Sequence, residues 1–145
     1  MLPTIKILMR WASSLVLLLL TACTSKSSTN DVSKELRSVK SWAATAHMVG
    51  DAWKRGAVPT AYAKQTLKKT QEELKKETDS LSKSSIDEEK RASILKSLFS
   101  LQTTLTQMST SIEHKSYKAL TQEIQQLSAQ EQNMTKLAQT ASGQS

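Results

Sequence analysis

Apolar and small residues recur in alternating steps of four and three through most of this chain. This spacing places them on one face of an α-helix, because the helix repeats every 3.6 residues. The first series, between about residues 31 and 55, consists of Val32, Leu36, Val39, Ala43, Ala46, Gly50 and Trp53, widened by Trp42 and Val49. Few turn-forming residues and few β-branched apolar runs interrupt the chain, which also favours helix over strand. The pattern predicts an all-α fold.

Three further series of the same kind follow. The second helix is expected from about residue 59 to 82, with Ala63, Leu67, Thr70, Leu74 and Leu81 on one face. The third has Ile94, Leu98, Leu101, Leu105, Met108 and Ile112, broadened by Leu95 and Phe99. The fourth has Tyr117, Leu120, Ile124, Leu127 and Met134.

The ends of these helices carry recognisable signals. Asn30 or Asp31 can cap the first helix. Gly56 suits the left-handed residue that ends a helix and Pro59 suits the first turn of the next, so residues 56–59 are predicted to form a turn. After a break at residues 82–85, Ser85 and Glu88 fit a capping box. The apolar phase slips after Ile112, which predicts a turn at 113–116, although a single bent helix is a competing interpretation.

Four amphipathic segments joined by short turns predict an antiparallel up-down four-helix bundle over residues 31–138, followed by a frayed tail at 139–145. The alternative is two long helical hairpins that pair with a partner chain.

The first 22 residues have the layout of a secretory signal peptide. Two basic residues, Lys6 and Arg10, precede an apolar run from Trp11 to Leu20, which is shorter than the roughly 20 residues of a transmembrane helix. The run ends in Leu20, Thr21, Ala22 and Cys23, and this sequence resembles the lipobox of bacterial lipoproteins.

The resemblance implies cleavage of the signal, residues 1–22, before Cys23 and attachment of lipid to the Cys23 thiol. Residues 23–30 would then form a flexible tether, and two or more acyl chains would hold the protein on a membrane. Thr24 stands where inner-membrane lipoproteins of Gram-negative bacteria often carry Asp. The expected location is therefore the outer membrane facing the periplasm in a Gram-negative cell, or the outer face of the plasma membrane in a Gram-positive one. Cys23 is the only cysteine, so no disulfide can form within the chain.

The charge of the expected mature chain is mildly basic. All 13 acidic residues and all but two of the 20 basic residues follow Ala22, which leaves a net charge of +5. This balance favours attraction to anionic surfaces. Both signs are mixed along the chain and no dense basic run alternates with aromatics, so a nucleic acid partner is not expected.

Candidate chemistry is sparse. His47 and Asp51 are four residues apart and can share a helix face, but a transition-metal site usually needs three or four ligands. Met48, Met108 and Met134 are expected to fill the core rather than to bind copper. No arrangement of a nucleophile with a base, or of facing carboxylates, is evident. We expect neither a catalytic site nor a metal nor another cofactor.

Trp42 and Trp53 are the most informative aromatic residues. They lie on similar faces of one helix and are expected to plug the bundle core, with Tyr62 packing beside the turn. The alternative is a partner-binding tip at the end of the bundle away from the tether, formed by Trp53, Lys54, Arg55, Tyr62 and Lys115. His114 and Lys118 would add to the positive charge of that tip.

The expected function is that of a non-enzymatic, lipid-anchored interaction or accessory module of the cell envelope. The partner would be an envelope protein or an anionic envelope polymer, and a homo-oligomer is possible. The second class is a binding protein for an apolar ligand or an anionic polymer.

Overall fold

A computed structural model describes residues 27–141 and residue 143 of the chain. Four helices follow one another: α2 (Ser27–Lys54), α3 (Thr60–Ser82), α4 (Glu88–Glu113) and α5 (Tyr117–Ala141). The predicted signal peptide, Cys23 and residues 24–26 of the predicted tether lie outside the described residues.

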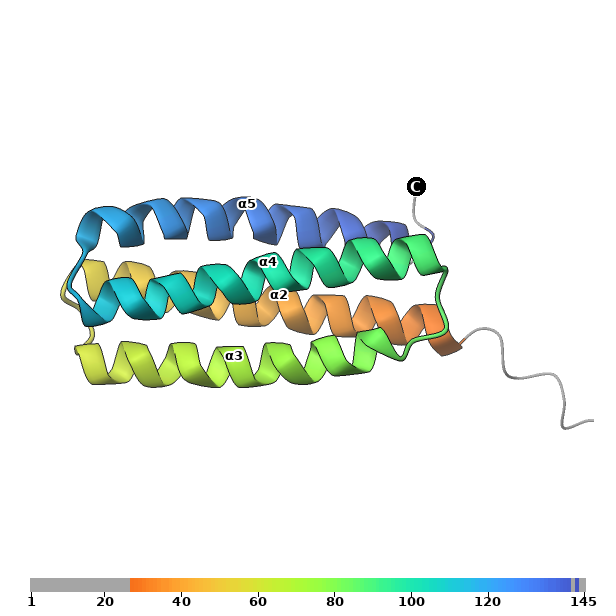
Figure 1. The fold of residues 1–145 in the computed structure, drawn as a ribbon, viewed down its shortest axis with the longest axis horizontal. Coiled ribbons are helices and arrows are strands. Elements are labelled where there is room, and N and C mark those ends of the chain that lie inside the picture. Colours follow the sequence, from red (N-terminus) through yellow and green to blue (C-terminus); the bar gives the residue numbers. More distant parts are fainter. Residues whose placement is uncertain (1–26, 142, 144–145) are drawn as a thin grey trace, which may run out of the picture.

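The helices form an up-down four-helix bundle, as the sequence predicted (Figure 1). Each helix contacts the next one in sequence, and the most extensive contact joins α2 to α5 and closes the ring. The apolar faces of the four helices bury one another within a single chain. The alternative of two hairpins that need a partner chain is therefore wrong.

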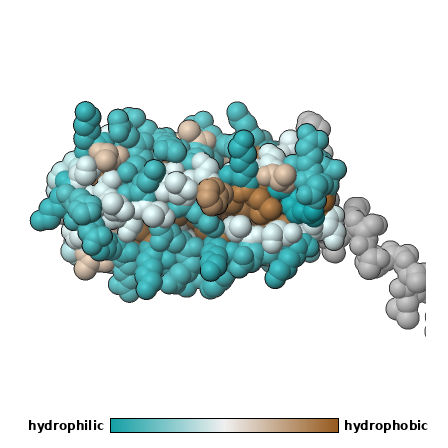
Figure 2. Space-filling view, viewed as in Figure 1, coloured by the Kyte–Doolittle hydropathy of each residue, from teal (hydrophilic) through white to brown (hydrophobic). Residues whose placement is uncertain are grey.

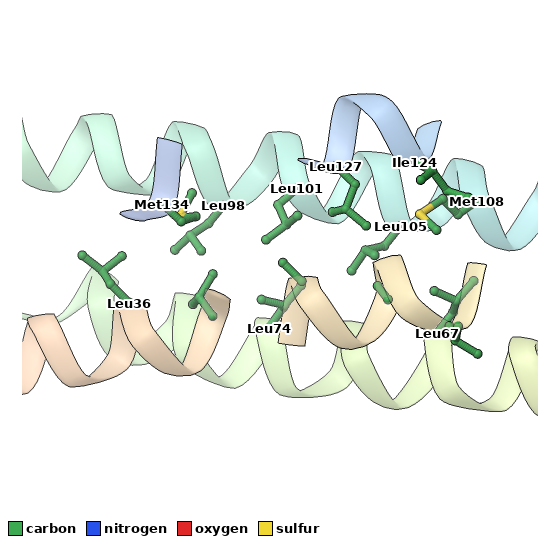
Figure 3. Close-up of a cluster of buried hydrophobic side chains, with 14 of the residues drawn as sticks. Leu36, Leu67, Leu74, Leu98, Leu101, Leu105, Met108, Ile124, Leu127 and Met134 are labelled. Carbon is green, nitrogen blue, oxygen red and sulfur yellow. The ribbon is translucent and has the colours of Figure 1, made fainter. Parts of the chain in front are cut away.

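The predicted seams form the core. Every predicted seam position of α2, α3 and α4 is buried, as are Leu120, Ile124, Leu127 and Met134 of α5. Figure 3 shows leucine and methionine side chains from several helices meeting in the interior. Burial of this apolar surface supplies the main driving force for folding.

Gly50 marks a place where helices approach closely. A Cβ atom added to Gly50 would lie 2.7 Å from Cε of Met108 and 3.4 Å from Ile124. The small residue therefore makes room for side chains of α4 and α5 to pack directly on the α2 backbone.

Three predicted core positions are wrong. Phe99 is 72% exposed and Met48 is 69% exposed, while Tyr117 is 53% exposed. Phe99 and Met48 lie next to the buried apolar face of their helices, but their side chains are exposed to solvent. Leu95, also expected to broaden the α4 seam, is half-buried and packs against the core.

Helix ends differ from the predictions by a few residues. Helix α2 begins at Ser27, before the caps expected at Asn30 or Asp31, and α5 continues through Ala141, into the predicted tail. Pro59 lies just before α3 as its N-cap residue instead of in the first turn.

The start of α4 is capped by Asp87, so the predicted capping box of Ser85 and Glu88 is wrong. The Asp87 carboxylate accepts hydrogen bonds from the backbone N–H of Glu89 at 3.0 Å and of Lys90 at 3.2 Å. The acidic Glu88 and Glu89 occupy the first turn, where the helix dipole favours negative charge.

The predicted turn at residues 113–116 is confirmed as a complete break. Lys115 has φ of 53°, and the backbone N–H of Ser116 bonds to the carbonyl of Ser111 at 2.8 Å. A continuous bent helix is therefore excluded.

No helix among the described residues is long and apolar enough to cross a membrane.

Replacing Asp87 by Ala should lower the free energy of unfolding by about 1 kcal/mol, because two backbone donors at the start of α4 lose their acceptor. Ser85→Ala is the matched control and should change stability by less than about 0.5 kcal/mol. Urea unfolding followed by circular dichroism measures both. A larger loss for Ser85→Ala than for Asp87→Ala would show that the assigned cap is wrong.

Candidate partner-binding end

Two of the three turns lie at one end of the bundle. The turn between α2 and α3 and the turn between α4 and α5 both lie at the end away from the start of α2 (Figure 1). We call residues 51–64 and 113–118 the two-turn end. Residues 27–37, 79–91 and 136–141 form the opposite end.

Backbone hydrogen bonds close both turns. Gly56 has φ of 73°, a conformation that favours glycine, and its N–H bonds to the carbonyl of Trp53 at 2.9 Å. The N–H of Ala57 bonds to Ala52 at 2.8 Å. In the second turn, the carbonyl of Ser116 accepts the first helical bond of α5 from Leu120 at 3.0 Å. These hydrogen bonds fix the backbone from which the side chains at this end project.

Trp53 is buried beneath the two turns. It is only 5% exposed, and its Nε1–H donates to Oγ1 of Thr60 at 3.0 Å. Its ring stacks on Tyr117 with centroids 5.0 Å apart and ring planes 19° apart. Trp53 thus joins α2 to the starts of α3 and α5, which confirms its expected role as a core plug. Trp42 is partly buried and packs against the same core.

Thr60 and Tyr117 were not predicted as partners of Trp53. A buried indole N–H needs an acceptor, and Thr60 opens the helix that follows the turn, so the sequence contained a signal for this hydrogen bond. The stacking on Tyr117 depends on which helix is the neighbour of α2, and the apolar spacing does not specify that neighbour.

The remaining residues of the predicted tip reach solvent to different extents. Tyr62 is 54% exposed, and Arg55 and Lys115 are exposed as well. Lys54 is half-buried. The structure brings these residues to one end but leaves Trp53 beneath the surface.

Acidic side chains partly neutralise this end. Asp51 faces both Arg55 at 3.3 Å and Lys54 at 3.9 Å. Lys64 of α3 pairs with Glu113 of α4 at 3.0 Å. The hydrogen bond from Lys64 lowers the pKa of the Glu113 carboxyl below its ordinary value, and the positive charge of Lys64 acts in the same direction.

Positive charge nevertheless remains in excess at the two-turn end. Its segments contain five lysine or arginine residues and two carboxylates, whereas the opposite end contains six of each. Basic and acidic residues are mixed along the sequence. The excess of positive charge at one end therefore results from which segments the turns bring together there.

The histidine expected near a possible metal site has another neighbour. Nδ1 of His47 lies 3.4 Å from a carboxylate oxygen of Glu131 on α5, while Asp51 faces Lys54 and Arg55. Within residues 27–141, no group of three or more His, Cys, Asp or Glu side chains is arranged to hold a metal ion.

An apolar area also reaches the surface of the bundle. Figure 2 shows it on one face, in the half nearer the turn between α3 and α4. Among the described residues, Phe99 and Met48 are the most exposed large apolar side chains, and neither belongs to the two-turn end.

Comparison with protein-family models, with curated proteins and with solved structures gives no match to this chain. The site itself is therefore the basis for any assignment of function.

Replacing Lys64 by Met should raise the pKa of Glu113 toward that of an ordinary glutamate, because the carboxylate loses its hydrogen bond and its positive neighbour. The carboxyl carbon of Glu113, followed by NMR during a pH titration, reports this pKa directly. Lys68→Met is the control, since it removes an exposed lysine of the same helix.

The sign of the effect on stability follows from the lowered pKa. The pair contributes at pH values above the ordinary glutamate pKa, and its contribution is lost as the pH falls through the lowered pKa of the folded state. An unchanged Glu113 pKa in Lys64→Met would contradict the assigned pair.

Proposed function

We propose that this protein is a lipid-anchored, non-enzymatic module of the bacterial cell envelope, which binds an anionic partner through its two-turn end. The observation that carries the proposal is the gathering of both turns, with an excess of positive charge, at the end away from the start of α2.

The lipobox supports attachment at the opposite end. Helix α2 begins at Ser27, four residues after Cys23, so a lipid on Cys23 would hold the start of α2 near the membrane. Each methylene buried in the bilayer contributes about 0.8 kcal/mol, and two chains suffice for stable anchoring. In a Gram-negative cell Thr24 favours the outer membrane facing the periplasm, and in a Gram-positive cell the anchor would lie in the outer face of the plasma membrane.

The length of the bundle then separates the two-turn end from the membrane. Helix α2 has 28 residues, which corresponds to about 42 Å at roughly 1.5 Å per residue. A partner that lies away from the bilayer surface, such as a cell-wall polymer or another envelope protein, is within reach of this end.

The chemistry of the two-turn end suits an anionic partner. Arg55 and Lys115 are exposed and Tyr62 presents an exposed aromatic ring. Arginine and tyrosine are common in the energetically important positions of protein interfaces. Positive charge on this end would speed association with an acidic surface and orient it.

The placement of the ionisable groups supports a role without catalysis. The described groups with a displaced pKa are Lys69, Glu73 and Glu113, and each is explained by a charged neighbour on an exposed helix surface. Catalytic groups with displaced pKa values more typically lie in a cleft.

The test is site-specific photo-crosslinking in cells that produce the protein. A photoreactive residue in place of Tyr62 should yield an adduct with an envelope component, whereas the same residue in place of Lys40, an exposed position halfway along α2, should not. Lys54→Glu, Arg55→Glu and Lys115→Glu together should reduce the adduct about tenfold, which corresponds to about 1.4 kcal/mol.

The matched control reverses three charges at the opposite end: Lys34→Glu, Lys83→Glu and Lys90→Glu. Helical circular dichroism confirms that both triple variants fold. Cosedimentation of the purified protein with isolated cell walls separates a polymer partner from a protein partner. Equal adducts from both triple variants would rule out binding through the two-turn end.

A further inference from the structure

An apolar hollow lies at the opposite end of the bundle. Its volume is about 550 Å³, and its lining comes from the start of α2, the start of α4 with the residues before it, and the end of α5. The apolar part of the lining consists of Val32, Ile86, Ile94, Leu137 and Ala141. This volume falls within the roughly 300–1,000 Å³ of small-molecule sites.

The hollow has a buried apolar floor and a solvent-exposed rim. Val32 and Ile94 are 1% and 3% exposed, whereas Ile86, Leu137 and Ala141 are half-buried. Asp87, Glu89 and Lys90 also line it and are exposed. An apolar floor with a charged rim fits a ligand that is apolar along its length.

If residues 1–22 are removed, as the proposed cleavage before Cys23 implies, the residues that flank the described helices offer no apolar side chain to cover this floor. Residues 24–26 are Thr, Ser and Lys, and residues 142–145 are Ser, Gly, Gln and Ser. Leaving apolar surface open to water is unfavourable, so an apolar group that reaches the hollow is stabilised there.

We propose that the hollow takes up one fatty acyl chain of the lipid on Cys23 when the protein is away from a bilayer. This inference rests on the proposed lipid anchor, because the acyl chain exists only if Cys23 is modified.

The choice of this ligand rests on how close the hollow lies to Cys23. Val32, on its floor, is five residues beyond the start of α2, which is about 7.5 Å of helix. Three residues lie between Cys23 and Ser27, and the four Cα–Cα steps that join these two residues span at most about 14 Å when extended. A lipid on Cys23 therefore starts close to the hollow, at the end of the bundle where α2 begins.

Such shielding has a direct consequence for transport. A protein with exposed acyl chains associates with itself or with any membrane it meets. A protein that covers one chain can cross the aqueous envelope with less exposed apolar surface, and it releases the chain when a bilayer offers a larger apolar volume.

The experiment uses the lipidated protein from cells grown with a diazirine-bearing fatty acid, which places a photoreactive acyl chain on Cys23. The protein is purified, transferred to detergent-free buffer and irradiated, and the cross-linked peptides are identified by mass spectrometry. The proposal predicts cross-links within one molecule from the acyl chain to residues 86–94 and 137–141.

Two variants sharpen the test. Ala141→Phe adds a ring to the wall of the hollow and should remove most of the intramolecular cross-links. Ala92→Phe adds the same ring at an exposed α4 position that does not line the hollow, and should leave them unchanged.

The outcomes separate this inference from the proposed anchor. An acylated Cys23 whose cross-links are only intermolecular, or are equal in both variants, overturns the acyl-binding hollow and leaves the lipid anchor standing. An unmodified Cys23 thiol overturns both.

Discussion

Burial of four apolar helix seams in one core is the constraint on which the rest of this structure depends. The chain has one cysteine, so no internal disulfide can support the fold, and packing of these seams must do so. Short connections between the helices force successive helices to run in opposite directions. That topology brings the turns at 55–59 and 114–116 to one end and the start of α2 to the other (Figure 1). Hydrogen bonds at the edges of the core, such as Ser38 to Glu77 and Ser111 to Glu123, link neighbouring helices and help to fix their register.

The sequence predicted the core well because helical periodicity and burial are directly related. The prediction of burial was wrong for side chains whose exposure depends on how close the neighbouring helix lies. Phe99 occupies the flank of a correctly predicted seam, but its ring is 72% exposed. Tyr117 continues the α5 seam at its first residue, where the ring leaves the core and stacks on Trp53. The cap of α4 was placed two residues early, because Ser85 and Asp87 are both good capping residues and the spacing of Ser85 to Glu88 imitates a capping box.

The sequence predicted which residues lie at the two-turn end, but not the contacts that they make with other helices. Sequence and topology together were enough to place Lys54, Arg55, Tyr62 and Lys115 at one end. The pairing of Lys64 with Glu113 and the burial of Trp53 beneath the turns required the structure, because each depends on contacts between different helices. The two ends of the bundle consequently differ in character: one is basic and closed by turns over Trp53, and the other is balanced in charge and contains an apolar hollow. A protein held by lipid at the second end would present the first to the envelope.

The proposed orientation of the bundle on a membrane is tested most directly by the height of its two ends above a bilayer. The lipidated protein, with Ala57→Cys or Lys83→Cys carrying a fluorescent label, would be inserted in vesicles whose headgroups carry an energy acceptor. The account predicts strong transfer from position 83 and weak transfer from position 57, because helices of 23 to 28 residues hold the ends about 35–42 Å apart. Equal transfer from both positions, as for a bundle lying flat on the bilayer, would contradict it.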